Sequence, residues 1–81
     1  MSVIVYSKPR CVQCDATTRA LDKLGVSYAM VDVTQDAESL ELIISLGYQQ
    51  APVVMFGETH WSGYRPDKIK MVAQQLVGVS A

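Results

Sequence analysis

The chain has 81 residues, 49% of them hydrophobic, and a net charge of −1 at pH 7. This length predicts one small domain spanning residues 1–81, near the lower end of the sizes that fold on a single hydrophobic core. The charge balance argues against nucleic acid or an anionic membrane as the main partner, because both would require a basic excess.

The first predicted strand leads into a pair of cysteines three positions apart. Residues 3–5 are all β-branched, which favours a strand, and a polar turn containing proline follows. From residue 12 to residue 24 the apolar positions recur every three to four residues, which predicts a helix ending near Gly25. Cys11 and Cys14 therefore fall at the start of a helix.

The start of a helix suits redox chemistry at sulfur. Its first N–H groups lack backbone partners and carry a partial positive charge, so they would stabilise a thiolate at Cys11. Lys8 and Arg10 flank this thiol and would favour the same ionised form, although exposed charges contribute modestly in salt. Cys14 would supply a second thiol, held close enough to resolve a mixed disulfide within the molecule.

Two other uses of the cysteines remain open at this point. A closed zinc site needs more ligands than the two cysteines and His60 supply, unless two chains share it. A structural disulfide with so short a span would close little chain. The chain shows no signal-peptide pattern and no apolar run as long as a membrane span, so we expect a soluble cytoplasmic protein. In that compartment such a pair is more often catalytic or metal-binding than structural.

The middle of the chain predicts a strand and a second helix. Residues 26–33 are rich in β-branched and aromatic side chains and predict a strand parallel to the first, reached by a right-handed crossover. Thr34 and Asp36 are candidate caps for a helix that ends at Gly47. Its apolar positions on one face are Ala37, Leu40, Ile43 and Ile44.

The last third predicts a hairpin and a third helix. Pro52 lacks an N–H and fits the first position of a strand over residues 53–56, which a turn at Gly57 connects to a strand over residues 59–61. Residues 62–67 form a turn-rich connector, and the last helix places Ile69, Val72, Ala73, Leu76 and Val77 on one stripe and runs to Gly78. The order β-α-β-α-β-β-α indicates an α/β fold.

Three local motifs in this order resemble the thioredoxin/glutaredoxin superfamily, and more narrowly the NrdH-redoxins. They are Cys11-Val12-Gln13-Cys14, Ala51-Pro52, and Trp61-Ser62-Gly63-Tyr64-Arg65-Pro66-Asp67. The last is similar to a W-S-G-F-R-P-D signature, with Tyr64 in the phenylalanine place. The resemblance implies a thioredoxin fold with a four-stranded mixed sheet and three helices.

The resemblance also implies a function. The protein would be a small dithiol electron carrier that thioredoxin reductase reduces and that donates electrons to the large subunit of class Ib ribonucleotide reductase. No cofactor and no metal would be bound; the redox group would be the Cys11–Cys14 disulfide, with NADPH and FAD acting on the reductase. We expect a cytoplasmic monomer.

The resemblance assigns roles to individual residues. Cys11 would be the attacking thiol, Cys14 the resolving thiol and Pro52 a cis proline that exposes the backbone of Ala51 to an added strand from a partner. The remaining candidate partner contacts are Lys8, Arg10, Val12, Gln13, Ser62, Gly63 and Tyr64. The signature residues are assigned as a structural motif: Trp61, Arg65, Pro66 and Asp67. Trp61 is favoured as a packing residue. Arg65 would anchor a carboxylate of a partner, connect the turn to a neighbouring loop, or lie in solvent.

The main alternative is a glutathione-dependent glutaredoxin. Features that resemble a glutathione site are missing: Gln13 replaces an aromatic residue, Gln50-Ala51 replaces Thr-Val, and Ser62-Gly63 replaces paired glycines, although Lys8 remains. We therefore expect reduction by thioredoxin reductase and negligible turnover with glutathione. A metal-binding module, or a scaffold module with incidental thiols, is the less favoured reading.

Overall fold

The structure is a computed structural model that describes residues 2–77, and its elements follow the predicted order. The predicted Gly78 end of the last helix lies outside the described residues. The elements are β1 (Val3–Ser7), α1 (Val12–Lys23), β2 (Tyr28–Asp32), α2 (Ala37–Ser45), β3 (Val53–Phe56), β4 (Thr59–Ser62) and α3 (Pro66–Val77). The predicted thioredoxin fold is confirmed.

The four strands form one mixed sheet in the order β2-β1-β3-β4. β1 pairs with β2 in parallel, from Val3 opposite Tyr28 to Ser7 opposite Asp32. β3 is antiparallel both to β1 and to β4. β1 therefore lies inside the sheet, between β2 and β3. The loop that follows its last residue, Ser7, leads to Cys11.

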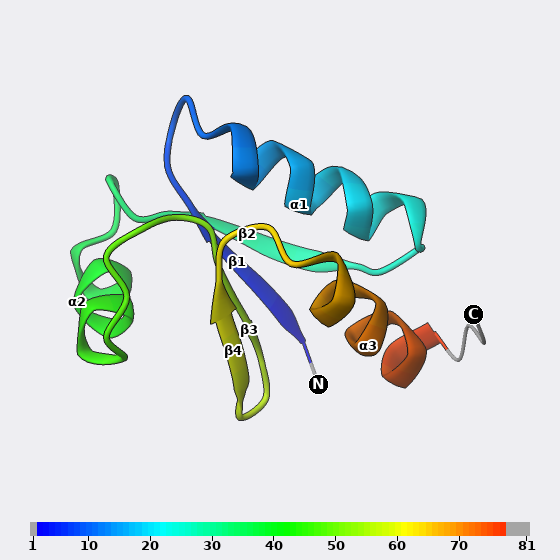
Figure 1. Ribbon diagram of the computed structural model, residues 1–81. Helices are drawn as coiled ribbons and strands as arrows, with labels where there is room; N and C mark the ends of the chain where they lie inside the picture. Colours follow the sequence, from blue (N-terminus) through cyan, green and yellow to red (C-terminus); the bar gives the residue numbers. More distant parts are fainter. Residues whose placement is uncertain (1, 78–81) are drawn as a thin grey trace.

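The helices cover both faces of this sheet, with α1 and α3 on one face and α2 on the other (Figure 1). Strand residues alternate between the faces because successive side chains point to opposite sides. Val5 and Val54 pack with Leu21 of α1 and Ile69 of α3. On the second face the buried cluster consists of Tyr6, Val33, Ile43 and Val53.

The second helix, α2, packs less tightly than its apolar pattern suggests. Asp36 caps it by accepting hydrogen bonds from the N–H groups of Glu38 and Ser39, whereas Thr34, the other candidate cap, hydrogen-bonds to Asp32 instead. Of the four apolar positions predicted on one face, Ile43 alone is buried. This helix therefore presents apolar surface to solvent.

The first helix begins at the sheet end that β1 reaches. It ends with Leu24 as its C-cap and Gly25 in the left-handed region, as the sequence predicts. α1 and α3 also contact each other along the same face of the sheet. Within residues 2–77, none of the helices has the length and apolar character that crossing a membrane requires.

Candidate active site

The two cysteines form a disulfide at the start of α1. Cys11 is the N-cap residue, and its Sγ accepts a hydrogen bond of 3.1 Å from the N–H of Cys14. Cys11 is 8% exposed and Cys14 only 1%, so Cys11 is the outer of the two. An incoming group therefore meets Cys11 first.

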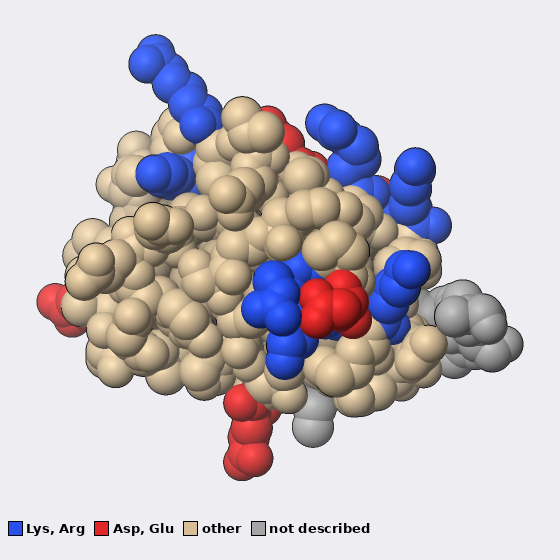
Figure 2. All heavy atoms as spheres, in the orientation of Figure 1, with Lys and Arg blue, Asp and Glu red and all other residues tan. Residues whose placement is uncertain are grey.

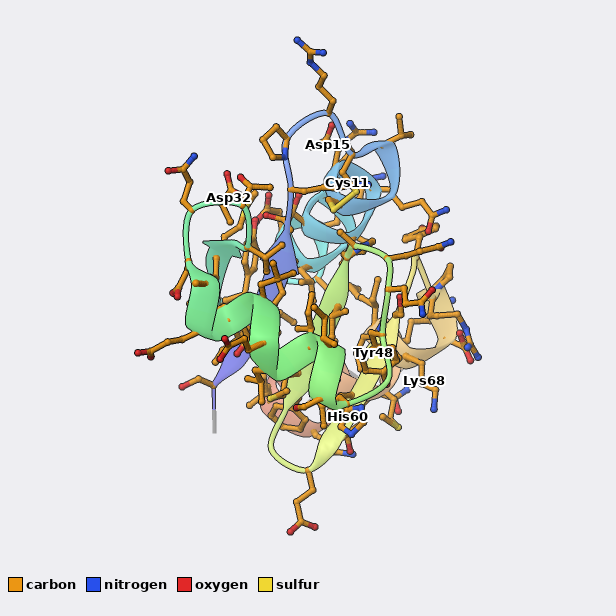
Figure 3. All side chains as sticks on the ribbon, turned by 90° about the vertical axis from the view of Figure 1, so that its left-hand side faces the viewer. Cys11, Asp15, Asp32, Tyr48, His60 and Lys68 are labelled. Carbon is orange, nitrogen blue, oxygen red and sulfur yellow. A yellow bond between two sulfur atoms is a disulfide. The ribbon has the colours of Figure 1, made fainter. Side chains whose placement is uncertain are left out.

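The corner that presents Cys11 has an unusual backbone. Arg10, just before it, has φ +58°, in the left-handed region that side-chain-bearing residues seldom adopt. This corner turns the chain between the end of β1 at Ser7 and the start of α1 at Val12. Figure 3 shows the disulfide at the end of the molecule where this loop lies.

A hollow of about 350 Å³ opens beside Cys11. We call it the mouth. The loop before α1 and the first turn of α1 form one wall of the mouth. The chain before β3 forms the other wall. Besides Cys11, its lining residues are Lys8, Arg10, Val12, Gln13, Gln50 and Ala51.

Five residues predicted to contact a partner thus share one hollow with Cys11. Val12 is 83% exposed at its rim, which leaves an apolar side chain in solvent next to the disulfide. The Ala51–Pro52 peptide bond is cis, as expected, and Pro52 is buried behind Ala51.

The remaining candidate contacts lie in the connector between β4 and α3 (residues 63–65) and at the end of β4. The N–H of Gly63 donates to the carbonyl of Pro52 at 2.8 Å, and the Ser62 hydroxyl donates to the carbonyl of Gln50 at 3.1 Å. The N–H of Tyr64 donates to Oε1 of Gln13 at 3.2 Å. These bonds join the connector to both walls of the mouth.

The other signature residues have structural positions. Trp61 is buried in the core on the α1 and α3 face, in agreement with the packing role favoured for it; its Nε1 has no hydrogen-bond partner among the described residues. Pro66 is the first residue of α3. Within the part of the chain that the structure describes, the Arg65 side chain is not bonded to a neighbouring loop, which was one alternative considered for it; instead its Nε donates to one Asp67 carboxyl oxygen at 3.3 Å and a terminal nitrogen donates to the other at 3.2 Å. Those hydrogen bonds hold the pKa of the Asp67 carboxyl below its usual value.

A second, apolar hollow of about 470 Å³ adjoins the mouth, and the sequence did not predict it. It lies between α2 and the chain before β3, and it shares Lys8, Gln50 and Ala51 with the mouth. Leu40 and Ile44, which line it, are 40% and 58% exposed. Figure 2 shows that uncharged atoms cover most of the left-hand part of the surface, where α2 lies in Figure 1.

His60 lies apart from the cysteines. Its Nδ1 is 2.6 Å from the Tyr48 hydroxyl, and the two rings meet edge to face. Figure 3 shows this pair near the end of α2, away from Cys11. Among residues 2–77, no cluster of three or more His, Cys, Asp or Glu side chains is placed to hold a metal ion. His60, the third residue considered as a ligand of a metal site, therefore contacts Tyr48 and lies away from the two cysteines.

Comparison with known proteins agrees with this geometry. Residues 3–61 match the Glutaredoxin family. The chain is 42% identical over 69 residues to the glutaredoxin-like protein NrdH of Salmonella typhimurium and 41% identical to that of Escherichia coli K12, with 85% of each chain covered in both cases.

Solved structures show the same relation. The glutaredoxin-like protein NrdH-redoxin from Escherichia coli, whose activity profile is described as thioredoxin-like, superposes with a TM-score of 0.86 at 39% identity. That match covers 89% of this chain and 95% of the other. A buckwheat glutaredoxin in complex with glutathione is more distant, with a TM-score of 0.70 and 28% identity over 94% of this chain and 73% of the other.

Proposed function

Because the chain belongs to the glutaredoxin family and, within it, to the NrdH-like thiol–disulfide oxidoreductases, we propose that Cys11 attacks target disulfides and that Cys14 resolves the resulting adduct. The observation that carries this assignment is the difference in exposure at the mouth: Cys11 lines it, while Cys14 is buried behind. Attack on sulfur requires a direct approach along the breaking bond, which Cys11 alone can make.

The proposed reaction has two exchange steps. In the first, the Cys11 thiolate of the reduced protein bonds to one sulfur of the target disulfide, and the other target sulfur leaves as a thiolate. In the second, the Cys14 thiolate bonds to the Cys11 sulfur and releases the second target thiolate. Two electrons and, after protonation, two protons pass to the target, and the Cys11–Cys14 disulfide re-forms.

The surroundings of Cys11 support a protein as the target. Ala51 lines the mouth, so an extended target segment would pair with its backbone as an added strand. The adjoining apolar hollow would accept a side chain of the same segment. Lys8 and Arg10 would favour an acidic or carboxylate-bearing segment over a basic one. Of the signature residues, Arg65 ends the connector, Trp61 precedes it in β4, and Pro66 and Asp67 begin the helix that follows it.

The partners that we propose are thioredoxin reductase as electron donor and the large subunit of class Ib ribonucleotide reductase as acceptor. The NrdH name of the relatives supports the acceptor, and the thioredoxin-like activity profile described for the Escherichia coli NrdH-redoxin supports the donor. NADPH and FAD would act on the reductase. The protein would act in the cytoplasm, where reduced cysteine pairs persist, as a monomeric single domain.

The decisive experiment has a donor arm and a trapping arm. The oxidised protein should be reduced in an NADPH-oxidation assay by thioredoxin reductase, with negligible turnover by glutathione and glutathione reductase. The opposite ranking would favour a glutathione-dependent glutaredoxin.

In the trapping arm, the Cys11 thiolate of reduced Cys14→Ser protein should attack the disulfide of the oxidised ribonucleotide reductase subunit and release one of its thiolates. The resulting disulfide-linked adduct should be visible by mass spectrometry without reductant. Cys11→Ser protein, the matched control, should form none. Equal trapping by both variants would contradict the assignment, and no adduct with any disulfide substrate would favour the scaffold reading.

A further inference from the structure

The side chain of Gln13 joins two segments that lie 51 residues apart. Gln13 belongs to the first turn of α1, directly before Cys14, and its Oε1 accepts the 3.2 Å hydrogen bond from the N–H of Tyr64. The connector approaches this oxygen closely. A Cβ atom at position 63 would lie only 3.3 Å from it, and the residue there is glycine with φ +86°. The close approach therefore depends on the absence of a side chain at Gly63.

The same connector is fixed to the opposite wall of the mouth. Gly63 donates to the Pro52 carbonyl, and Ser62, at the end of β4, donates to the Gln50 carbonyl. The turn that carries Cys11 is thus linked through Gln13 to the connector, and through the connector to the residues on either side of Ala51. Gln13 and Ala51 line the same hollow.

We propose that Gln13 is a positioning residue that determines specificity for protein disulfides by holding the two walls of the mouth at a fixed separation. This inference rests on the proposed exchange at Cys11. The Gln13 carboxamide is uncharged and carries no proton that the reaction uses, so it acts on recognition of an extended target and leaves the sulfur chemistry unchanged. It also occupies the Tyr64 N–H, which a target therefore does not bind.

Two disulfides of different size separate recognition from chemistry. Insulin presents its disulfides within a polypeptide that must enter the mouth, whereas hydroxyethyl disulfide is small enough to reach Cys11 without contacting both walls. The reduced protein is mixed with each in excess, and the second-order rate constants are compared as a ratio. A general loss of folding or thiol reactivity would lower both rate constants and leave the ratio unchanged.

In Gln13→Ala protein the insulin rate constant should fall about 2- to 10-fold relative to the hydroxyethyl disulfide rate constant, the range that the loss of one net hydrogen bond produces. Gln13→Glu should restore most of the ratio, because a carboxylate oxygen can accept from the same N–H. Gln74→Ala, at an exposed position on α3, is the matched control and should behave as wild type.

Two results would overturn the proposal: an unchanged ratio in Gln13→Ala, whether or not both rate constants fall, or a Glu variant whose ratio is no higher than that of the Ala variant. They are distinguishable from a failure of the proposed function itself. In that case wild-type protein would reduce neither disulfide, and the positioning role would fall with it.

Discussion

Replacing Gly63 with alanine tests how closely the connector and the first turn of α1 are matched. The backbone there has φ +86°, so any side chain incurs the left-handed penalty of about 1–2 kcal/mol. For a domain of this size that loss corresponds to a fall in melting temperature of about 4–16 °C. The added methyl group would also lie 3.3 Å from Oε1 of Gln13, so the end of this flexible side chain would have to shift and its hydrogen bond to Tyr64 would weaken.

Gly25 supplies the matched control for this substitution. It too has a positive φ, +73°, but a Cβ there would meet nothing within 4 Å, and it lies at the other end of α1 from the disulfide. Gly25→Ala should therefore lose comparable stability in thermal unfolding followed by circular dichroism. It should keep the wild-type ratio of insulin to hydroxyethyl disulfide rate constants.

The two variants should therefore diverge in function while agreeing in stability. Gly63→Ala should lower the rate ratio about 2- to 10-fold, because displacement of the Gln13 side chain weakens one hydrogen bond. The reasoning is refuted if Gly63→Ala melts like wild type, or if its rate ratio matches that of Gly25→Ala.

Three further predictions concern the fold around the site. Ile69→Ala removes a fully buried side chain of α3 and should lower the free energy of unfolding by about 2–5 kcal/mol in urea denaturation. A loss no larger than that of a substitution at an exposed position would contradict the tight packing of Ile69. Tyr48→Phe removes the hydrogen bond to His60 and should lower that free energy by about 0.5–1.5 kcal/mol; an unchanged value would contradict this contribution. The bond to Arg65 lowers the pKa of Asp67, so this pair adds stability above the usual carboxyl pKa and loses it as pH falls through the lowered value. Arg65→Ala should raise the Asp67 pKa in a carboxyl-carbon NMR titration, and an unchanged value would rule out the pair as its cause.

The sequence predicted most of the fold because its signals are local. A β-branched run, two helical stripes and a glycine at the end of α1 each specify an element without reference to distant residues. The strand predicted over residues 26–33 is shorter in the structure, at Tyr28–Asp32. Its partner β1 has five residues, and the pairing therefore stops at Tyr28 and Asp32. Val26 lies before the paired segment and Val33 after it, and both are buried.

The parts of the site that were missed depend on contacts between distant segments. Both cysteines and the cis bond before Pro52 were predicted, because short motifs carry them. The bond between Gln13 and Tyr64 and the apolar hollow along α2 were not, since each requires the relative placement of separate loops. The spacing of Leu40 and Ile44 indicated a helix face but not that this face would stay open to solvent.

The left-handed backbone at Arg10 limits which substitutions can test the role of the Arg10 charge. With φ at +58°, position 10 accepts asparagine or glycine readily and β-branched residues poorly. Arg10→Val would therefore alter the backbone that aims Cys11, and its defect could be mistaken for the loss of a cation. Arg10→Asn removes the cation and leaves the bend in place. The choice of residue at position 10 is therefore limited by the backbone conformation as well as by the contacts of the side chain.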